Sequence, residues 1–255
     1  MGASAGGGPR LPPVFQLIAL DRVSSTMDEA RRLAEEGAEE GTLVWGREQT
    51  GGRGRLGRQW VSPRGNLYLS LVLRPEVPLG EAAQFGFVAA LAIGEAIGSV
   101  APPVDVTYKW PNDVLVNGRK VSGVLLEAAS RPDGALDFIV LGCGINLLSF
   151  PEGTGYPATC LRFEGAREVT EEELLEAFAR HFLAWTSRWR DEGFAAVRKV
   201  WLRHADRLGE QIKVNLPRET LEGRFEDLDE SGRLRLRLPD GSCRHISSGD
   251  VFAPA

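Results

Sequence analysis

The chain has 255 residues, of which 43% are hydrophobic and 25% are charged, as in an ordinary globular protein with one large domain and room for a small second one. Its net charge of -5 argues against a general nucleic-acid-binding surface. No apolar run approaches the ~20 residues of a membrane span, and the N-terminus lacks a signal-peptide pattern. Three scattered cysteines predict reduced thiols in a cytoplasmic protein, without a disulfide framework or a metal site.

The first elements along the chain are a strand and a helix. Small residues predict a flexible tail over 1–13, and apolar alternation predicts a strand over 14–20. A helix then begins after Ser25 and stops before Gly37. Two hypotheses stay open for the hydroxyls of Ser25 and Thr26. They cap this helix and do nothing else, which is the simpler interpretation, or they also meet the polar head of a ligand.

A basic glycine-rich segment, residues 47–64, follows and is central to the prediction. It contains five arginines, one acid and four glycines, and it lies between expected strands over 42–47 and 66–73. Glycine allows a backbone to approach a ligand closely, and arginine is a forked donor suited to phosphate and carboxylate oxygens. The segment is therefore predicted to close over an anionic group. The alternative is a solvated basic surface loop.

Two standard nucleotide motifs do not fit this segment. Gly52 to Gly57 matches G-x-G-x-x-G literally, but the proline-containing sequence after it has no helical period, and the dinucleotide motif needs a helix there. The P-loop also fails, because Arg58 and Gln59 stand where lysine and serine or threonine are required.

The middle of the chain predicts a buried helix and more of a sheet. Residues 79–99 read as a buried helix whose internal Gly86 and Gly94 predict close helix–sheet packing. A strand over 104–109 leads into Trp110-Pro-Asn-Asp113, and apolar runs on either side of Asn117-Gly118 predict a hairpin over 114–126. A further strand over 138–145 ends in Gly142-Cys-Gly-Ile-Asn146, where Cys143 is expected to be a small core residue.

The last third predicts two helices and a second module. Residues 147–168 look irregular, and a capping box at Thr170 opens a helix to about residue 190, followed by another over 194–204. From 206 onward, short alternating strands predict a small β-barrel. The expected organisation is thus a tail over 1–13, a catalytic domain over 14–205 and a barrel over 206–255.

Three islands of this sequence, in order, resemble the biotin protein ligases. They are the loop that includes Gly52-Arg-Gly-Arg-Leu-Gly-Arg58-Gln-Trp60, then Lys109-Trp-Pro-Asn-Asp113 with Gly118-Arg-Lys-Val-Ser-Gly123, and then Gly142-Cys-Gly-Ile-Asn146. The resemblance covers roughly residues 14–252. It implies an α+β fold in which a mixed β-sheet is flanked by helices, as in class II synthetases, with a small C-terminal SH3-like β-barrel.

The resemblance also implies a reaction. Biotin's carboxylate attacks the α-phosphate of ATP, with Mg²⁺, to give biotinyl-5'-AMP and diphosphate, and a lysine of a biotin carboxyl carrier protein of acetyl-CoA carboxylase then releases AMP. Lys120 would bridge the carboxylate and the α-phosphate as a catalytic group, together with Arg53, Arg55 and Arg58. The implied biotin-binding residues are Ser25, Thr26, Met27, Gln49, Gly52, Arg53, Gly54, Arg55, Lys120, Gly123 and Gly142. The implied ATP- and adenylate-binding residues are Arg55, Arg58, Trp60, Lys109, Asn112 and Asn146. The Mg²⁺ ligands are left unassigned.

The sequence departs from the family at one position, and rival interpretations stay open. Met27 stands where the family often has asparagine. Only thirteen residues precede Val14, too few for the DNA-binding module of repressor-type members, so we expect a ligase that binds no DNA and no membrane. Family members commonly dimerise, and a homodimer is expected here. The rivals are a lipoate-type ligase of the same superfamily, a non-enzymatic biotin-binding regulator and a binding-only storage protein.

Overall fold

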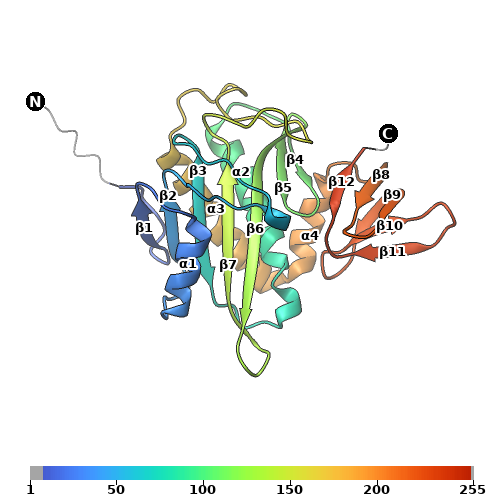
Figure 1. The fold of residues 1–255 in the computed structure, drawn as a ribbon, viewed down its shortest axis with the longest axis horizontal. Coiled ribbons are helices and arrows are strands. Elements are labelled where there is room, and N and C mark those ends of the chain that lie inside the picture. The colour runs from blue at the N-terminus through green and yellow to red at the C-terminus, as the bar shows by residue number, and fades with distance from the viewer. Residues whose placement is uncertain (1–7, 254–255) are drawn as a thin grey trace, which may run out of the picture.

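The computed structural model describes residues 8–253, which fold around two β-sheets (Figure 1). The first sheet has the strand order β1-β2-β3-β7-β6-β5-β4. Its strands are β1 (Gln16–Leu20), β2 (Thr42–Gly46), β3 (Leu67–Leu73), β4 (Val106–Lys109), β5 (Asp113–Val116), β6 (Arg119–Ser130) and β7 (Leu136–Ile145). β1 and β2 are parallel and the other pairs are antiparallel, so the sheet is mixed, as expected. Residues 1–7 of the predicted tail lie outside the described residues.

Helices cover both faces of this sheet (Figure 1). They are α1 (Thr26–Glu35), α2 (Gln84–Val100), α3 (Glu171–Glu192) and α4 (Phe194–Arg203). Because side chains alternate along a strand, neighbouring residues enter different clusters. Leu71 joins α2 and α3 in the main core, whereas Val72 and Val140 pack with Met27 and Ala30 of α1. Met27 of α1 also lines a cavity on this face of the sheet.

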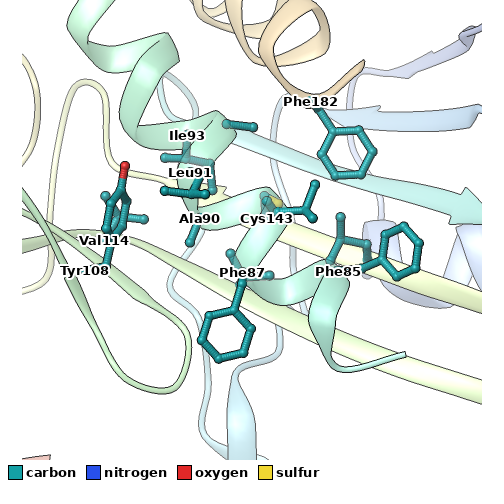
Figure 2. Close-up of a cluster of buried hydrophobic side chains, with 14 of the residues drawn as sticks. Phe85, Phe87, Ala90, Leu91, Ile93, Tyr108, Val114, Cys143 and Phe182 are labelled. Atoms are coloured by element: carbon teal, nitrogen blue, oxygen red, sulfur yellow. The ribbon is translucent and has the colours of Figure 1, made fainter. Parts of the chain in front are cut away.

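The main core is rich in aromatic residues and confirms several predictions (Figure 2). Phe182 of α3 is buried in this cluster, and Cys143 is 4% exposed, as expected for a small core residue. A Cβ built on Gly94 would lie 2.3 Å from the Tyr108 hydroxyl, so this glycine allows α2 to pack closely on β4. The same expectation is wrong for Gly86, because a Cβ there would meet nothing within 4 Å.

The predicted turn and helix signals also hold. Asn117 and Gly118 have φ values of 50° and 73°, as the tight turn between β5 and β6 requires. Thr170 and Glu173 form the capping box that opens α3. The helix continues to Glu192, slightly beyond the expected end.

Among the described residues, α2 belongs to the one helical segment whose length and composition resemble a membrane span. With the short turn before it, the segment Leu79–Val100 is long and apolar enough to cross a membrane, so the sequence expectation that no run qualifies was too strict. In the structure, 67% of its most apolar window is buried inside the protein. The apolar surface of α2 is therefore used by the core.

A second, antiparallel sheet has the order β11-β10-β9-β8-β12. Its strands are β8 (Gln211–Asn215), β9 (Thr220–Leu228), β10 (Leu234–Arg237), β11 (Cys243–Ile246) and β12 (Asp250–Phe252). Trp110 Nε1 donates to the Gly232 carbonyl at 3.0 Å, and Arg198 donates to the Leu228 carbonyl at 2.6 Å. The first bond attaches the second sheet to the segment after β4 of the first sheet, and the second bond attaches it to α4. Closure into a barrel and the boundary at residue 206 stay predictions.

Asn66 fastens the start of β3 to the segment after β7. It is 1% exposed, and its Oδ1 accepts from the backbone N–H groups of Leu147, Leu148 and Ser149 at 3.0, 2.8 and 3.1 Å. Its Nδ2 donates to the Ser149 carbonyl at 2.9 Å. One side chain thus orders the chain that leaves β7.

We expect Asn66→Ala to lower the free energy of unfolding by about 3 kcal/mol, because it leaves several buried backbone groups unpaired. Urea denaturation measures the loss. Asn215→Ala is the control, since that exposed amide has one side-chain partner and should change stability by less than about 0.5 kcal/mol. Equal losses in the two variants would contradict the assigned role of Asn66.

Candidate active site

A cavity of about 390 Å³ opens beside the N-terminus of α1. Its walls come from the glycine–arginine loop (residues 47–64), the ends of β6 and β7, the segment 151–158 and residues 249–252 of the second sheet. Residues far apart in the sequence are therefore brought together as predicted. The lining includes Ser25, Thr26, Met27, Gln49, Arg53, Gly54, Arg55, Arg58, Trp60, Lys109, Asn112, Lys120, Gly123, Gly142 and Asn146.

Gly52 is the one expected site residue that is absent from the lining. A Cβ on it would lie 2.4 Å from the Trp60 carbonyl and 2.5 Å from Ser62 Oγ. Its contribution is to let the two arms of the loop close on each other, with Trp60 N donating to the Gly52 carbonyl at 2.9 Å.

Ser25 corrects the simpler sequence interpretation. It occupies the N-cap position of α1, yet its side chain makes no capping hydrogen bond. The residue is 1% exposed and its hydroxyl has no hydrogen-bond partner among the described residues, although it lines the cavity. Buried hydroxyls are normally paired. An unpaired one at the cavity wall is available to a ligand.

Next to it, Thr26 and Gln49 form a fixed polar pair. Gln49 Oε1 accepts from the Thr26 backbone N–H at 2.9 Å and from the Thr26 hydroxyl at 3.0 Å. Thr26 is 3% exposed. This end of the cavity is therefore polar and sheltered from water.

Three glycines leave part of the sheet without side chains beside the cavity. Gly142 and Gly144 lie two residues apart on β7 and so face the same side, and Gly123 of β6 pairs directly with Gly144. A Cβ on Gly144 would lie 2.5 Å from the Trp60 indole, and one on Gly142 would lie 2.4 Å from Met27 Sδ. We call these three residues the glycine floor. Gly144 was not among the site residues expected from the sequence, although the spacing Gly-Cys-Gly could have indicated it.

The Lys120 amine lies beside this floor because β6 carries a bulge. Leu115 pairs with Lys120 and Val114 with Ser122, which leaves Val121 as an extra residue. In a regular strand, residues 120 and 123 would point to opposite faces. With the extra residue, a Cβ on Gly123 would lie 3.5 Å from Lys120 Nζ. Bulges commonly redirect side chains next to active sites.

The backbone of Lys120 is also held from its other side. Its N–H donates to the Pro157 carbonyl at 2.7 Å, and Thr159 N donates to its carbonyl at 2.9 Å. The amine itself lies 2.6 Å from Asp113 Oδ1 and 5.4 Å from the centre of a Trp60 ring. Asp113, which the sequence prediction quoted but gave no role, is thus the charge partner of Lys120.

Lys109 is the second cavity lysine, and it is 7% exposed. Its amine lies 4.1 Å from the centre of the Tyr156 ring and 4.0 Å from Asp113. Burial lowers the pKa of Lys109, and the nearby Asp113 carboxylate opposes that shift only in part. Burial likewise raises the pKa of Tyr156 to about 12. The charge of the buried Lys109 amine is only partly balanced by Asp113, so this amine is suited to bind an anion.

The three predicted arginines each meet protein partners. Arg53 donates to Glu127 at 2.8 Å and to Asp28 at 2.7 Å, and Arg58 pairs with Asp250 of the second sheet. Although partial burial opposes it, Arg31 and Arg53 hold the pKa of Glu127 below its ordinary value.

Arg55 is the arginine most enclosed by the cavity walls. It donates to Asn112 Oδ1 at 3.1 Å and to the Gly249 carbonyl at 3.3 Å, and burial lowers its pKa. These contacts, with the Arg58–Asp250 pair, join the glycine–arginine loop to the second sheet.

The two expected adenylate asparagines have structural partners in the cavity wall. Asn112 Nδ2 donates to the Val124 carbonyl at 2.6 Å, and its oxygen accepts from Arg55. Asn146 is 3% exposed and donates to the Thr159 carbonyl at 3.0 Å. Both position their neighbours around the cavity.

Within residues 8–253, no three His, Cys, Asp or Glu side chains gather as a metal cage. The cavity has two carboxylates in its lining, Asp113 and Asp250, and each is paired with a cation. Such a donor set suits Mg²⁺ only when phosphate oxygens supply most of its ligands.

Comparisons with known proteins agree with this geometry. The model of the biotin/lipoate A/B protein ligase family matches residues 11–203, and that of the biotin protein ligase C-terminal domain matches residues 208–253. The chain is similar to a biotin–[acetyl-CoA-carboxylase] ligase of Paracoccus denitrificans, with 41% identity over 91% of this chain and 98% of that one. It is 33% identical to the bifunctional ligase/repressor BirA of Bacillus subtilis, over 92% of this chain and 73% of that one.

A solved structure extends the likeness to three dimensions. The biotin protein ligase from Aquifex aeolicus, in complex with biotin and ATP, superposes with a TM-score of 0.78 at 31% identity and covers 93% of this chain and 97% of that one. The chain belongs to the biotin/lipoate A/B protein ligase family, and within it to the biotin protein ligases.

Proposed function

We propose that this cavity carries out both half-reactions of ATP-dependent biotin ligation to a carrier-protein lysine. The observation that carries the assignment is the position of Lys120, whose amine lies beside the glycine floor and close to Trp60. Both half-reactions place extra negative charge on acyl or phosphate oxygens. A fixed cation beside those oxygens stabilises that charge more in the transition state than in the ground state.

Biotin is proposed to lie with its ureido group at Ser25, Thr26 and Gln49. Its ring system would rest on the glycine floor once Trp60 and Met27, which lie against these glycines, move aside. The carboxylate would then reach Lys120, which leaves Asp113 to contact it. A cavity of about 390 Å³ is ample for biotin.

ATP is proposed to bind next to it, between Lys109, Trp60 and the arginines of the glycine–arginine loop. The biotin carboxylate attacks the α-phosphorus and diphosphate leaves, and the carrier lysine then attacks the acyl carbon and AMP leaves. Lys120 would contact the oxygen that links the two groups in both steps. Mg²⁺ would enter on the phosphates of ATP and neutralise part of their charge, with Asp113 and Asp250 as nearby carboxylates.

The proposed partner is the biotin carboxyl carrier protein of an acetyl-CoA carboxylase. We further propose a cytoplasmic homodimer that binds neither DNA nor a membrane. Three observations support this extension: the free cysteines, the net charge of -5 and the position of β1 at an edge of the sheet, where a second copy can add a strand. Size-exclusion chromatography with light scattering tests the dimer.

The polar end of the cavity favours biotin over lipoate. Lipoate's dithiolane has no strong hydrogen-bonding group, so it would leave the Ser25 hydroxyl unpaired and would not use the remaining hydrogen-bonding capacity of Thr26 and Gln49. Sites built to hydrogen-bond a ligand reject analogues that lack the matching group, often by about 10⁴-fold. We expect biotin to support ATP–diphosphate exchange and lipoate to support at least about 10³-fold less, measured as kcat/KM. Comparable exchange with lipoate would contradict the assignment.

Lys120→Ala is expected to lower kcat/KM of biotin-dependent exchange by at least about 100-fold, because it removes a fixed charge from the reacting oxygens. Transfer from preformed biotinyl-AMP to the carrier should fall as well. Lys199→Ala, which removes an exposed lysine of α4, is the matched control and should leave both rates unchanged. Normal exchange in Lys120→Ala would rule out the proposed role.

Lys109→Met is expected to increase the free energy of unfolding and to weaken the use of ATP. Because burial lowers the pKa of Lys109, the unfolded chain binds more protons than the folded one between that lowered pKa and the ordinary lysine value. The wild-type free energy of unfolding therefore gains a contribution that rises with pH across this window. The variant should be more stable by about 1 kcal/mol at pH 7, and the difference should shrink as pH rises. A difference independent of pH would contradict this explanation.

The same variant should impair ATP use. We expect its KM for ATP in the exchange reaction to rise by about tenfold or more, because a buried cation beside the phosphates is lost. An unchanged KM for ATP would contradict the proposal that Lys109 contacts the phosphates of ATP.

A further inference from the structure

Ser70 lies at the centre of β3 and is fully buried. It pairs with Gly142 of the glycine floor, but it does not line the cavity. Its hydroxyl lies 2.8 Å from the hydroxyl of Thr26, which does line the cavity. Any influence of Ser70 on a ligand therefore passes through Thr26.

The direction of every hydrogen bond in this group can be assigned. The Thr26 backbone N–H can only donate, so the atom of Gln49 that faces it at 2.9 Å is the amide oxygen. That oxygen can only accept, so the Thr26 hydroxyl, 3.0 Å away, donates its one proton to it. Ser70 must then be the donor to Thr26.

The other end of the amide is fixed independently. Gln49 Nε2 donates to Ser62 Oγ at 2.9 Å, and Ser62 donates its own proton to the Trp60 carbonyl at 2.8 Å. Ser62 can therefore only accept from Gln49. Both ends of the group thus agree on one orientation of the amide.

The donors and acceptors of Thr26 and Gln49 that are still unused define which hydrogen bonds a ligand can form with them. The Thr26 oxygen has accepted one hydrogen bond and donated its proton, so one lone pair is left and it can only accept. The Gln49 oxygen has accepted two bonds, so this residue offers one remaining amide hydrogen and can only donate. An acceptor beside a donor matches an N–H beside a C=O, which is the pattern of a cyclic urea.

We infer that Ser70 is a positioning residue that holds Thr26 as a hydrogen-bond acceptor, so that the site selects a ring N–H over a ring oxygen. The inference rests on the proposed function, because it assumes that biotin's ureido group occupies this end of the cavity. Ser70 and Gln49 together hold the Thr26 hydroxyl, the first as its donor and the second as its acceptor. Without the Ser70 hydroxyl one of these two contacts is lost, so the Thr26 side chain can rotate and direct its proton toward a ligand oxygen.

Biotin and two analogues test the inference, each analogue being a cyclic carbamate in which one ureido N–H is replaced by oxygen. Wild-type enzyme should disfavour one of them by about 100-fold or more in kcat/KM of ATP–diphosphate exchange, because two lone pairs would face each other. In Ser70→Ala that discrimination should fall by about tenfold. With biotin itself, KM should rise a few-fold and kcat should stay unchanged, as expected for a residue that acts on recognition alone.

Two further variants make the result decisive. Thr42→Ala removes a buried hydroxyl from the neighbouring strand β2, where it donates to the Glu39 carbonyl, and should leave the discrimination intact. Ser70→Cys is nearly isosteric with a weaker donor and should give an intermediate value, and it serves if Ser70→Ala does not fold. An unchanged ratio in the Ser70 variants, or an equal fall in Thr42→Ala, would overturn the inference. Absence of any biotin-dependent exchange in the wild type would instead overturn the proposed function.

Discussion

One extra residue in β6 determines how this site is built. Val121 is unpaired in the register with β5, and the bulge brings Lys120 and Gly123 to the same side of the sheet. Lys120 supplies a cation, and Gly123, which has no side chain, lets the Trp60 ring lie close to the sheet beside it. The segment 157–159 holds the backbone of Lys120 from its open side. The amine is thus placed by the sheet itself, beside the glycine–arginine loop.

Three cations at the cavity each have carboxylate partners that an anionic ligand can replace. Lys120 contacts Asp113, Arg53 contacts Glu127 and Asp28, and Arg58 contacts Asp250. Each cation is therefore stabilised when no anionic ligand is bound. Phosphate and carboxylate oxygens can replace Asp113 at Lys120 without leaving this partly buried cation alone, which is the costly alternative. Arg53 and Arg58 are exposed, so water screens the exchange of their partners. The links from Arg55 and Arg58 to residues 249 and 250 involve the second sheet in this exchange.

Much of the fold could be predicted from local signals. The Asn117-Gly118 turn and the Thr170 capping box each act within a few residues, so sequence alone identifies them. All but one of the site residues that the family motifs implied line the cavity, but the motifs did not indicate the segments 151–158 and 249–252, which complete it. What sequence could not indicate depends on register and on contacts between distant segments. The bulge at Val121 and the pairing of Ser70 with Thr26 are of this kind, and Ser25 was misjudged because a good capping residue need not form the cap.

The most direct test of the account is a crystal structure with a non-hydrolysable biotinyl-AMP analogue. The account predicts that the oxygens linking acyl and phosphate groups lie within about 3 Å of Lys120 Nζ, that the ring system rests on the glycine floor, and that Lys120 has moved away from Asp113. An adenylate bound elsewhere, or one whose linking oxygens face away from Lys120, would contradict it.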